Sequence, residues 1–175
     1  MARFEPARWL LPSFALTIIA VLTGATAPEL DVRDQILAAH NAERARTGVG
    51  PLRWNDSLAV GAQKWSEYLA RSGKFEHSPD LPGQSQLGEN IWGGTPGQFT
   101  PNKMVGAWIA EKRYFRPGPF PTNSATGRVQ DVTHYTQVVW GRTTDVGCAI
   151  ARGESEEILV CRYSAPGNII GQSPV

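Results

Sequence analysis

The sequence predicts an α+β fold, a three-layer α-β-α sandwich in which helices cover both faces of a central antiparallel sheet. Helical periodicity occurs in three segments of the first two thirds of the chain, and apolar segments typical of strands occupy the last third. The last two of these strands form a hairpin that is apolar on both faces, and such a sheet needs cover on both sides. A sheet packed on one side only is the alternative. The 175 residues suffice for one domain with a substantial core.

Three helices are predicted from capping residues and apolar stripes. The first spans residues 32–46 and ends in the turn-forming segment 47–51. The second begins at a cap formed by Asn55 or Asp56 and ends at Gly73. The third begins at Pro101, because proline suits the first turn of a helix. The stripes are Val32, Ile36, Leu37 and His40 in the first helix, Leu58, Ala59, Ala62, Trp65 and Leu69 in the second, and Met104, Val105, Trp108, Glu111 and Phe115 in the third.

The remaining segments are predicted loops and strands. Residues 78–98 and 116–130 are rich in turn-forming residues and are expected to be loops, with a short ordered piece at 88–92. Three strands are predicted, at residues 134–140, 147–152 and 158–163. A turn at residues 153–156 joins the last two into a hairpin.

The hairpin predicts a disulfide between the two cysteines of the chain, Cys148 and Cys161. When these two residues face each other, every apolar residue of one strand lies opposite an apolar residue of the other. On one face, Val146, Cys148 and Ile150 lie opposite Tyr163, Cys161 and Leu159. On the other face, Ala149 and Ala151 lie opposite Val160 and Ile158. A metal-binding cysteine pair is the competing interpretation, but the spacing does not resemble a zinc motif.

The N-terminus resembles a secretory signal peptide, residues 1–27, which leaves residues 28–175 as the mature domain. Arg3 and Arg8 give a positive start, residues 9–22 are mostly apolar, and ATA at 25–27 fits a cleavage site. Pro28 moves the expected cut toward Ala25, and an uncleaved N-terminal anchor is the alternative. We therefore expect a secreted or periplasmic protein, a location that favours the disulfide.

The mature domain is nearly neutral, with 15 basic and 15 acidic residues once Arg3, Arg8 and Glu5 are removed. No basic run is visible. Nucleic acid and acidic membrane surfaces are therefore not expected as partners, because both attract clustered cations. A monomer with no stable membrane span after removal of the signal is expected.

Four polar residues are candidates for a functional site: His77, Glu89, Glu111 and His134. His134 begins a predicted strand, where a sheet meets its loops. Both glutamates lie among apolar residues and need partners, for which histidine is suited. Taken singly, each glutamate is also explained by a salt bridge, and His77 by an ordinary surface position. His40 is expected to be a buried, hydrogen-bonded histidine of the first helix.

Several other chemistries are not supported by the motifs present. The chain contains no nucleophile elbow of the G-x-S-x-G type, no H-E-x-x-H pair and no phosphate-binding loop. A disulfide would also remove both thiols as nucleophiles.

Four C-terminal motifs resemble signature blocks of the CAP superfamily, which comprises cysteine-rich secretory, antigen 5 and pathogenesis-related 1 proteins. They are HYTQVVW (134–140), VGCA (146–149), VCRY (160–163) and PGNIIG (166–171), and AHNAER (39–44), LRWN (52–55) and GENI (88–91) follow the family's order. The resemblance covers about residues 30–174. The single cysteine pair, Val175 in place of a frequent tyrosine, and the lack of a cysteine-rich extension resemble a bare bacterial domain similar to plant pathogenesis-related 1 proteins.

The resemblance implies an α-β-α sandwich with a central cleft, and it places the family's two histidines and two glutamates at His77, Glu89, Glu111 and His134. It implies a secreted, non-enzymatic binding module that holds a divalent metal such as zinc through the histidines, with the glutamates as further candidates. Lipid, sterol or protein ligands are also implied. An apolar groove could be lined by tryptophans, although for most of them a place in the core is the better explanation: Trp54, Trp65, Trp92 and Trp108.

The alternative function is a hydrolase. The same histidines and glutamates could activate water on a metal ion or act directly as acid and base. Neither an oxyanion donor nor a specificity pocket can be identified in the sequence, so the binding module is preferred.

Overall fold

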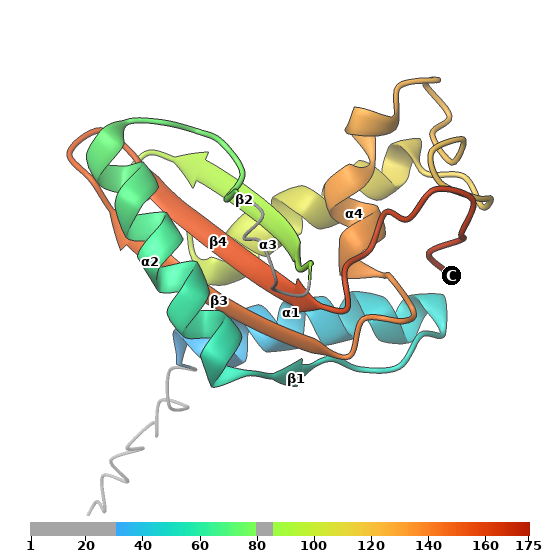
Figure 1. The fold of residues 1–175 in the computed structure, drawn as a ribbon, viewed down its shortest axis with the longest axis horizontal. Coiled ribbons are helices and arrows are strands. Elements are labelled where there is room, and N and C mark those ends of the chain that lie inside the picture. Colours follow the sequence, from blue (N-terminus) through green and yellow to red (C-terminus); the bar gives the residue numbers. More distant parts are fainter. Residues whose placement is uncertain (1–30, 80–85) are drawn as a thin grey trace, which may run out of the picture.

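The sheet of this domain is covered by helices on both faces, as the sequence predicts (Figure 1). The computed structural model describes residues 31–79 and 86–175, so the expected signal peptide at 1–27 lies outside the described residues. The strand order is β1-β3-β4-β2, where the strands are β1 (Arg53–Trp54), β2 (Gly88–Gly94), β3 (Asp145–Arg152) and β4 (Glu157–Ser164). The three long strands are antiparallel, and the short β1 joins β3 in parallel, so the sheet is mixed.

The three predicted long helices are confirmed, together with their caps. They are α1 (Val32–Thr47), α2 (Asp56–Ser72) and α3 (Pro101–Ala110). The Asn55 side chain accepts a hydrogen bond from the Leu58 amide at the start of α2, and Gly73 ends that helix in the left-handed conformation at a φ of 66°. After α3 the chain tightens into a short 3-10 helix, η1 (Glu111–Tyr114), so Glu111 lies just beyond the α-helix.

The predicted strand at residues 134–140 is wrong, because this segment begins as a short helix, α4 (Thr133–Val138). Its β-branched residues favour a strand locally, but tertiary contacts override that preference. The carboxylate of Glu111 accepts the backbone N–H groups of His134 and Tyr135 at the start of the helix. Tyr135 and Val138 then share one helical face and are buried in the core. A second 3-10 helix, η2 (Val129–Asp131), precedes it.

The hairpin of β3 and β4 has the predicted register, with Cys148 opposite Cys161 and a disulfide between them. One face of the sheet packs on α1, α3 and α4 through Val146, Leu159 and Tyr163. The other face packs on α2 through a second cluster: Ala62, Leu69, Ile91, Ala149, Ile158 and Val160. Two cores therefore explain why both faces of the hairpin are apolar.

Gly147 allows α2 to approach the sheet closely. A Cβ atom at this position would lie 2.2 Å from the Ala59 nitrogen and 2.4 Å from the Asn55 carbonyl oxygen. Since backbone cannot yield as a flexible side chain can, only glycine fits between β3 and the first turn of α2.

Replacing both Cys148 and Cys161 by alanine is expected to lower the free energy of unfolding by about 3 kcal/mol, because the unfolded chain regains the freedom that the closed loop removes. Urea denaturation of the variant and the wild type measures this difference. Reduced wild-type protein is the control and should unfold near the variant. Equal midpoints for the oxidised wild type and the variant would contradict the expectation.

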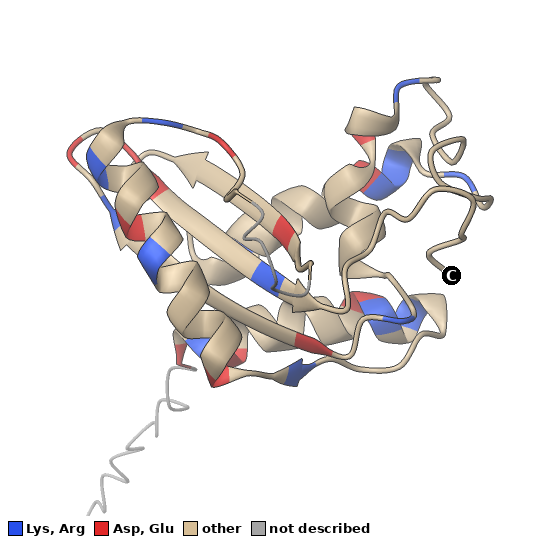
Figure 2. Ribbon diagram, viewed as in Figure 1, with Lys and Arg blue, Asp and Glu red and all other residues tan. Residues whose placement is uncertain are grey.

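Acidic and basic residues are interspersed over the helices and strands (Figure 2). Within residues 31–79 and 86–175, no helix combines the length and apolar character that crossing a membrane requires.

Candidate functional site

The first of two histidine–glutamate pairs joins His77 to Glu89. Glu89 lies on β2, and His77 lies in the segment that leaves α2 and returns along the sheet. The Nδ1 atom of His77 lies 2.9 Å from Oε1 of Glu89. The histidine side chain is 65% exposed whereas the glutamate side chain is 8% exposed, so the carboxylate is fixed inside and the imidazole lies at the surface.

Glu89 is held by more than the histidine. The backbone N–H of Ser78 donates to Oε1 at 2.9 Å and its hydroxyl donates to Oε2 at 2.8 Å. The Nε atom of Arg162, on β4, lies 3.5 Å from Oε2, which is an ion-pair distance without hydrogen-bond geometry. The Glu89 carboxylate therefore has partners for both oxygens even without a bound ligand.

These contacts set the charge of the first pair. Burial by itself would raise the pKa of Glu89, but the hydrogen bonds from His77 and Ser78 outweigh it and hold the pKa below its ordinary value. The same hydrogen bond to Glu89 raises the pKa of His77, against the opposing effect of burial. The pair is thus arranged as a carboxylate that orients an imidazole.

The second pair joins His134, in the first turn of α4, to Glu111 at the start of η1. The Nδ1 atom of His134 lies 2.6 Å from Oε1 of Glu111. The other oxygen, Oε2, accepts the N–H groups of His134 and Tyr135 at 3.0 and 3.1 Å. The Trp108 ring stacks on the imidazole at 6.2 Å between centroids, with the planes inclined by 16°. Glu111 therefore fixes both the ring and the backbone of His134.

The two pairs share one chemical arrangement. Each imidazole places Nδ1 against a carboxylate, and a carboxylate at Nδ1 favours the tautomer in which Nε2 carries a lone pair. Within the described part of the chain, neither Nε2 atom has a hydrogen-bond partner in protein. An imidazole held in this way is suited to ligate a metal ion or to accept a proton.

The predicted partnership of glutamates with histidines is thus found as two separate pairs. Among residues 31–79 and 86–175, no group of three His, Cys, Asp or Glu side chains is close enough to hold a metal ion. The gathering of all four residues in one cleft stays a prediction, as does their role as ligands.

His40 is a buried structural histidine, as expected. Its side chain is fully enclosed, Nδ1 donates to the Ile36 carbonyl at 2.9 Å, and Nε2 accepts from the Tyr163 hydroxyl at 2.8 Å. Burial lowers the pKa of His40 to about 4. The ring is neutral at pH 7 and takes no part in the surface chemistry.

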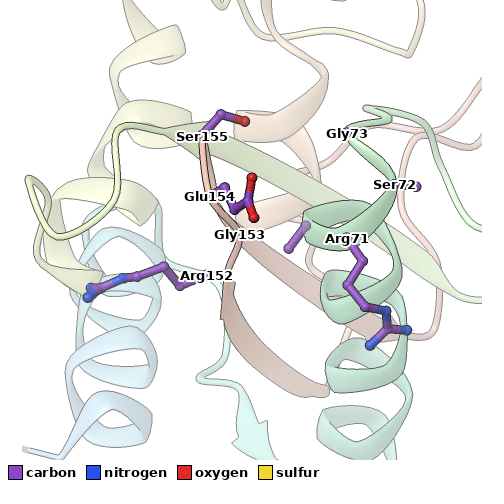
Figure 3. Close-up of a pocket in the computed structure, with 8 residues that line it drawn as sticks. Arg71, Ser72, Gly73, Arg152, Gly153, Glu154 and Ser155 are labelled. Carbon is purple, nitrogen blue, oxygen red and sulfur yellow. The ribbon is translucent and has the colours of Figure 1, made fainter.

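A surface depression of about 740 Å³ lies elsewhere, between the end of α2 and the turn that joins β3 to β4. Figure 3 shows that the side chains of Arg71 and Arg152 extend away from each other at its edges. Arg71 is paired with Glu67 and Arg152 with Glu157, so their guanidinium groups do not converge on a ligand.

Three neighbours of the histidine–glutamate pairs were not predicted as parts of a site: Ser78, Asn90 and Arg162. A fourth, Trp108, was predicted as a core residue or as the lining of an apolar groove, not as a neighbour of His134. Ser78 and Arg162 hold Glu89, whereas Trp108 and Asn90 contact His134. For Asn90 a sequence signal exists. Residues alternate between the faces of a strand, so the neighbour of Glu89 must point to the opposite side of β2. For the others the contacts depend on tertiary structure.

The CAP resemblance implies a three-layer sandwich whose cleft holds two histidines and two glutamates, and in the structure these four residues form two histidine–glutamate pairs. A family model described as "CAP: Cysteine-rich secretory protein family" matches residues 37–163. The chain belongs to this family.

Curated relatives agree with that assignment, and a solved structure shares the fold. Pathogenesis-related protein 1C of Nicotiana tabacum is 40% identical over 139 residues, which are 79% of this chain and 77% of the relative. A pathogenesis-related protein of the PR-1 type from Sambucus nigra is 37% identical over 138 residues, 78% of this chain and 77% of the relative. The crystal structure of NaASP2 with Zn2+ has a TM-score of 0.68 and 21% identity, over 82% of this chain and 84% of that one, which shows the shared fold.

Proposed function

We propose that this CAP-domain protein is a secreted or periplasmic, monomeric, non-enzymatic binding module that holds a divalent cation such as zinc through Nε2 of His77 and Nε2 of His134. The observation that carries the proposal is the pairing of both imidazoles with a carboxylate at Nδ1. Histidine ligands of metal ions characteristically donate their second ring nitrogen to a carboxylate, which fixes the tautomer and makes the ligand more basic.

The donor set fits zinc, because imidazole is a ligand that zinc, copper and nickel share. Glu89 and Glu111 would act as the outer partners of the histidines. A bound cation would supply a Lewis acid or a bridging charge for a ligand. Two protein ligands are fewer than the three or four of most zinc sites, so the binding is expected to be reversible and weaker than at a structural zinc site.

Two further features support the proposal. The disulfide of Cys148 and Cys161 suits an oxidising compartment outside the cytoplasm. The structure of NaASP2, which shares the fold, was described with Zn2+, and this makes zinc the first cation to test on this chain.

Calorimetric titration with zinc chloride tests the site. The wild type is expected to bind zinc, and the double variant His77→Ala, His134→Ala is expected to give no specific binding heat. Glu111→Gln should weaken binding about 10- to 100-fold, because the outer partner of a histidine ligand is lost. Asp56→Asn is the matched control, since this carboxylate is 88% exposed and belongs to no pair with histidine. Identical titrations of wild type and double variant would remove the metal site from the proposal.

The module is also proposed to carry an apolar ligand, a lipid or sterol, or to bind a protein. Apolar side chains exposed at the surface offer contacts for such ligands, among them Phe75 at 60%, Phe99 at 41% and Ile170 at 79%. Mass spectrometry of an organic extract of the purified protein tests lipid carriage, and an extract without lipid would count against it. Digestion of a peptide library with and without chelator tests the alternative, a hydrolase. Since a binding module is proposed, we expect no cleavage in either condition, and cleavage would support the hydrolase.

A further inference from the structure

Two adjacent residues of β2 connect this strand to the two histidine–glutamate pairs. Glu89 is a member of the first pair, and Asn90 contacts the second. Glu89 lies opposite Arg162 of β4, on the sheet face covered by α2, and its carboxylate holds His77. Asn90 lies opposite Cys161, and its side chain points to the other face, toward α4. This edge strand is therefore the element that both pairs have in common.

Asn90 is attached to His134 directly. Its Nδ2 group donates to the His134 carbonyl oxygen at 3.1 Å and to the Tyr163 hydroxyl at 3.3 Å. The asparagine is 2% exposed, so water competes little for these bonds. Tyr163 in turn donates to His40, whose other ring nitrogen is bonded to the backbone of α1. The amide that holds His134 is therefore itself fixed from behind.

Trp108 makes a second connection between β2 and His134. Its indole Nε1–H donates to the Ile91 carbonyl at 3.3 Å, and its ring stacks on the His134 imidazole. Trp108 is 2% exposed and lies in the core between the sheet and α3. Asn90 thus fixes the backbone of His134 relative to β2, while Trp108 fixes its ring relative to the next residue of the same strand.

Glu111 cannot replace these connections. It orients His134 from η1, and none of its hydrogen bonds reaches β2. Without Asn90 and Trp108, His134 would lose the two contacts that tie it to β2, and the first turn of α4 would open more often.

We propose that Asn90 and Trp108 are positioning residues that hold His134 in a fixed position relative to β2. They thereby keep the distance and orientation between Nε2 of His134 and Nε2 of His77 constant. The inference rests on the proposed function in one respect: a cation that binds both imidazoles requires a constant distance between their Nε2 atoms. Neither residue is proposed as a ligand of the cation.

The test compares Asn90→Leu and Trp108→Phe with a matched control. Leucine has nearly the shape of asparagine but no donor, and phenylalanine keeps a stacking ring but lacks the indole N–H. Asn41→Leu is the control, because the Asn41 side chain likewise makes two hydrogen bonds, both with the backbone of Leu52, and contacts neither histidine of the pairs.

Two measurements decide the outcome. In zinc titrations, Asn90→Leu and Trp108→Phe should weaken binding about tenfold or more, while Asn41→Leu should bind within about twofold of the wild type. In a His134→Ala background, Asn90→Leu should weaken zinc binding no further. Asn90 is proposed to act only through the His134 imidazole, which this background already lacks. Equal weakening in both backgrounds, or none in either, would overturn the positioning role.

Hydrogen exchange of the metal-free protein separates this inference from the proposed function. Asn90→Leu should speed exchange of the His134 and Tyr135 amides, which are bonded to Glu111, by at least about tenfold relative to an Asn41→Leu variant under the same conditions. If the wild type binds no zinc, the metal site fails, and this exchange result alone decides the positioning role. Unchanged exchange at both amides would contradict it.

Discussion

Replacing Arg44 by methionine is expected to lower the free energy of unfolding by about 4 kcal/mol or more, the largest effect of any single change considered for this protein. Arg44 is 1% exposed, and its guanidinium donates to four backbone carbonyls, one in the loop after α1 and three at the end of α4 and in the loop that follows it. The acceptors and distances are Gly50 at 2.6 Å, Val138 at 2.9 Å, Trp140 at 3.0 Å and Thr143 at 2.9 Å.

The reason for the size of this effect is the number of acceptors left without a donor. Each buried carbonyl that loses its partner costs about 1–3 kcal/mol. Relief of the buried charge offsets part of the loss, since burial already lowers the pKa of Arg44 to about 10. Arg44→Lys should recover only part of the stability, because an ammonium group cannot reach all four carbonyls in the plane of a guanidinium.

Urea denaturation monitored by tryptophan fluorescence measures the change. Arg46→Met is the control, since Arg46 is 68% exposed and its ion pair with Glu43 should contribute less than about 1 kcal/mol. A midpoint for Arg44→Met that matches the Arg46→Met midpoint would show that the carbonyls find other donors, and the structural role of Arg44 would be wrong.

Acidification from pH 6.5 to pH 4 is expected to lower the stability of the wild type by about 3 kcal/mol through His40 alone. The pKa of His40 is about 4 in the folded protein and 6.5 in the unfolded chain. Below pH 6.5 the unfolded chain therefore binds a proton that the folded protein does not, and the unfolded state gains stability until the pH falls through 4.

His77 acts in the opposite direction, because its pKa is raised in the folded protein. Its contribution is complete below pH 6.5 and is lost as the pH rises through the raised value. That contribution is small, since the side chain is 65% exposed and screened by solvent. The carboxylates whose pKa values are lowered, among them Glu89 and Asp145, stabilise the fold above their ordinary pKa values of 4.5 and 3.8 and lose that contribution as the pH falls below these values.

Denaturation with urea at intervals from pH 8 to pH 4 measures the expected loss. His40→Gln should be less stable than the wild type at pH 7, because the bonds to Ile36 and Tyr163 are disturbed, but its stability should fall much less between pH 6.5 and 4.5. His77→Gln is the control and should retain the decline. If His40→Gln and the wild type lose stability in parallel over this range, the burial of a neutral His40 does not govern the acid response.

The behaviour of α4 shows why pattern alone misplaces a short element. HYTQVVW ends in an apolar, partly β-branched run typical of a strand, while Tyr135, Val138 and Val139 have the spacing of one helical face, and short segments of this kind are ambiguous. Glu111 lies 22 residues upstream of Thr133, where α4 begins, and its carboxylate selects the helix by accepting two of its first N–H groups. No local feature of residues 134–140 records that contact.

Elements with local signals are predictable from the amino-acid order: α1, α2 and α3 through caps and periodicity, and the β3–β4 hairpin through its alternation and its cysteines. The amino-acid order also indicates that Glu89 and Glu111 need partners, because a carboxylate among apolar residues is costly to desolvate. The pairing of Glu89 with His77 and of Glu111 with His134, and the contacts of Asn90 and Trp108 with the second pair, follow from the fold. These contacts depend on distances between segments that lie far apart in the chain, and such distances are set when helices pack on both faces of the sheet.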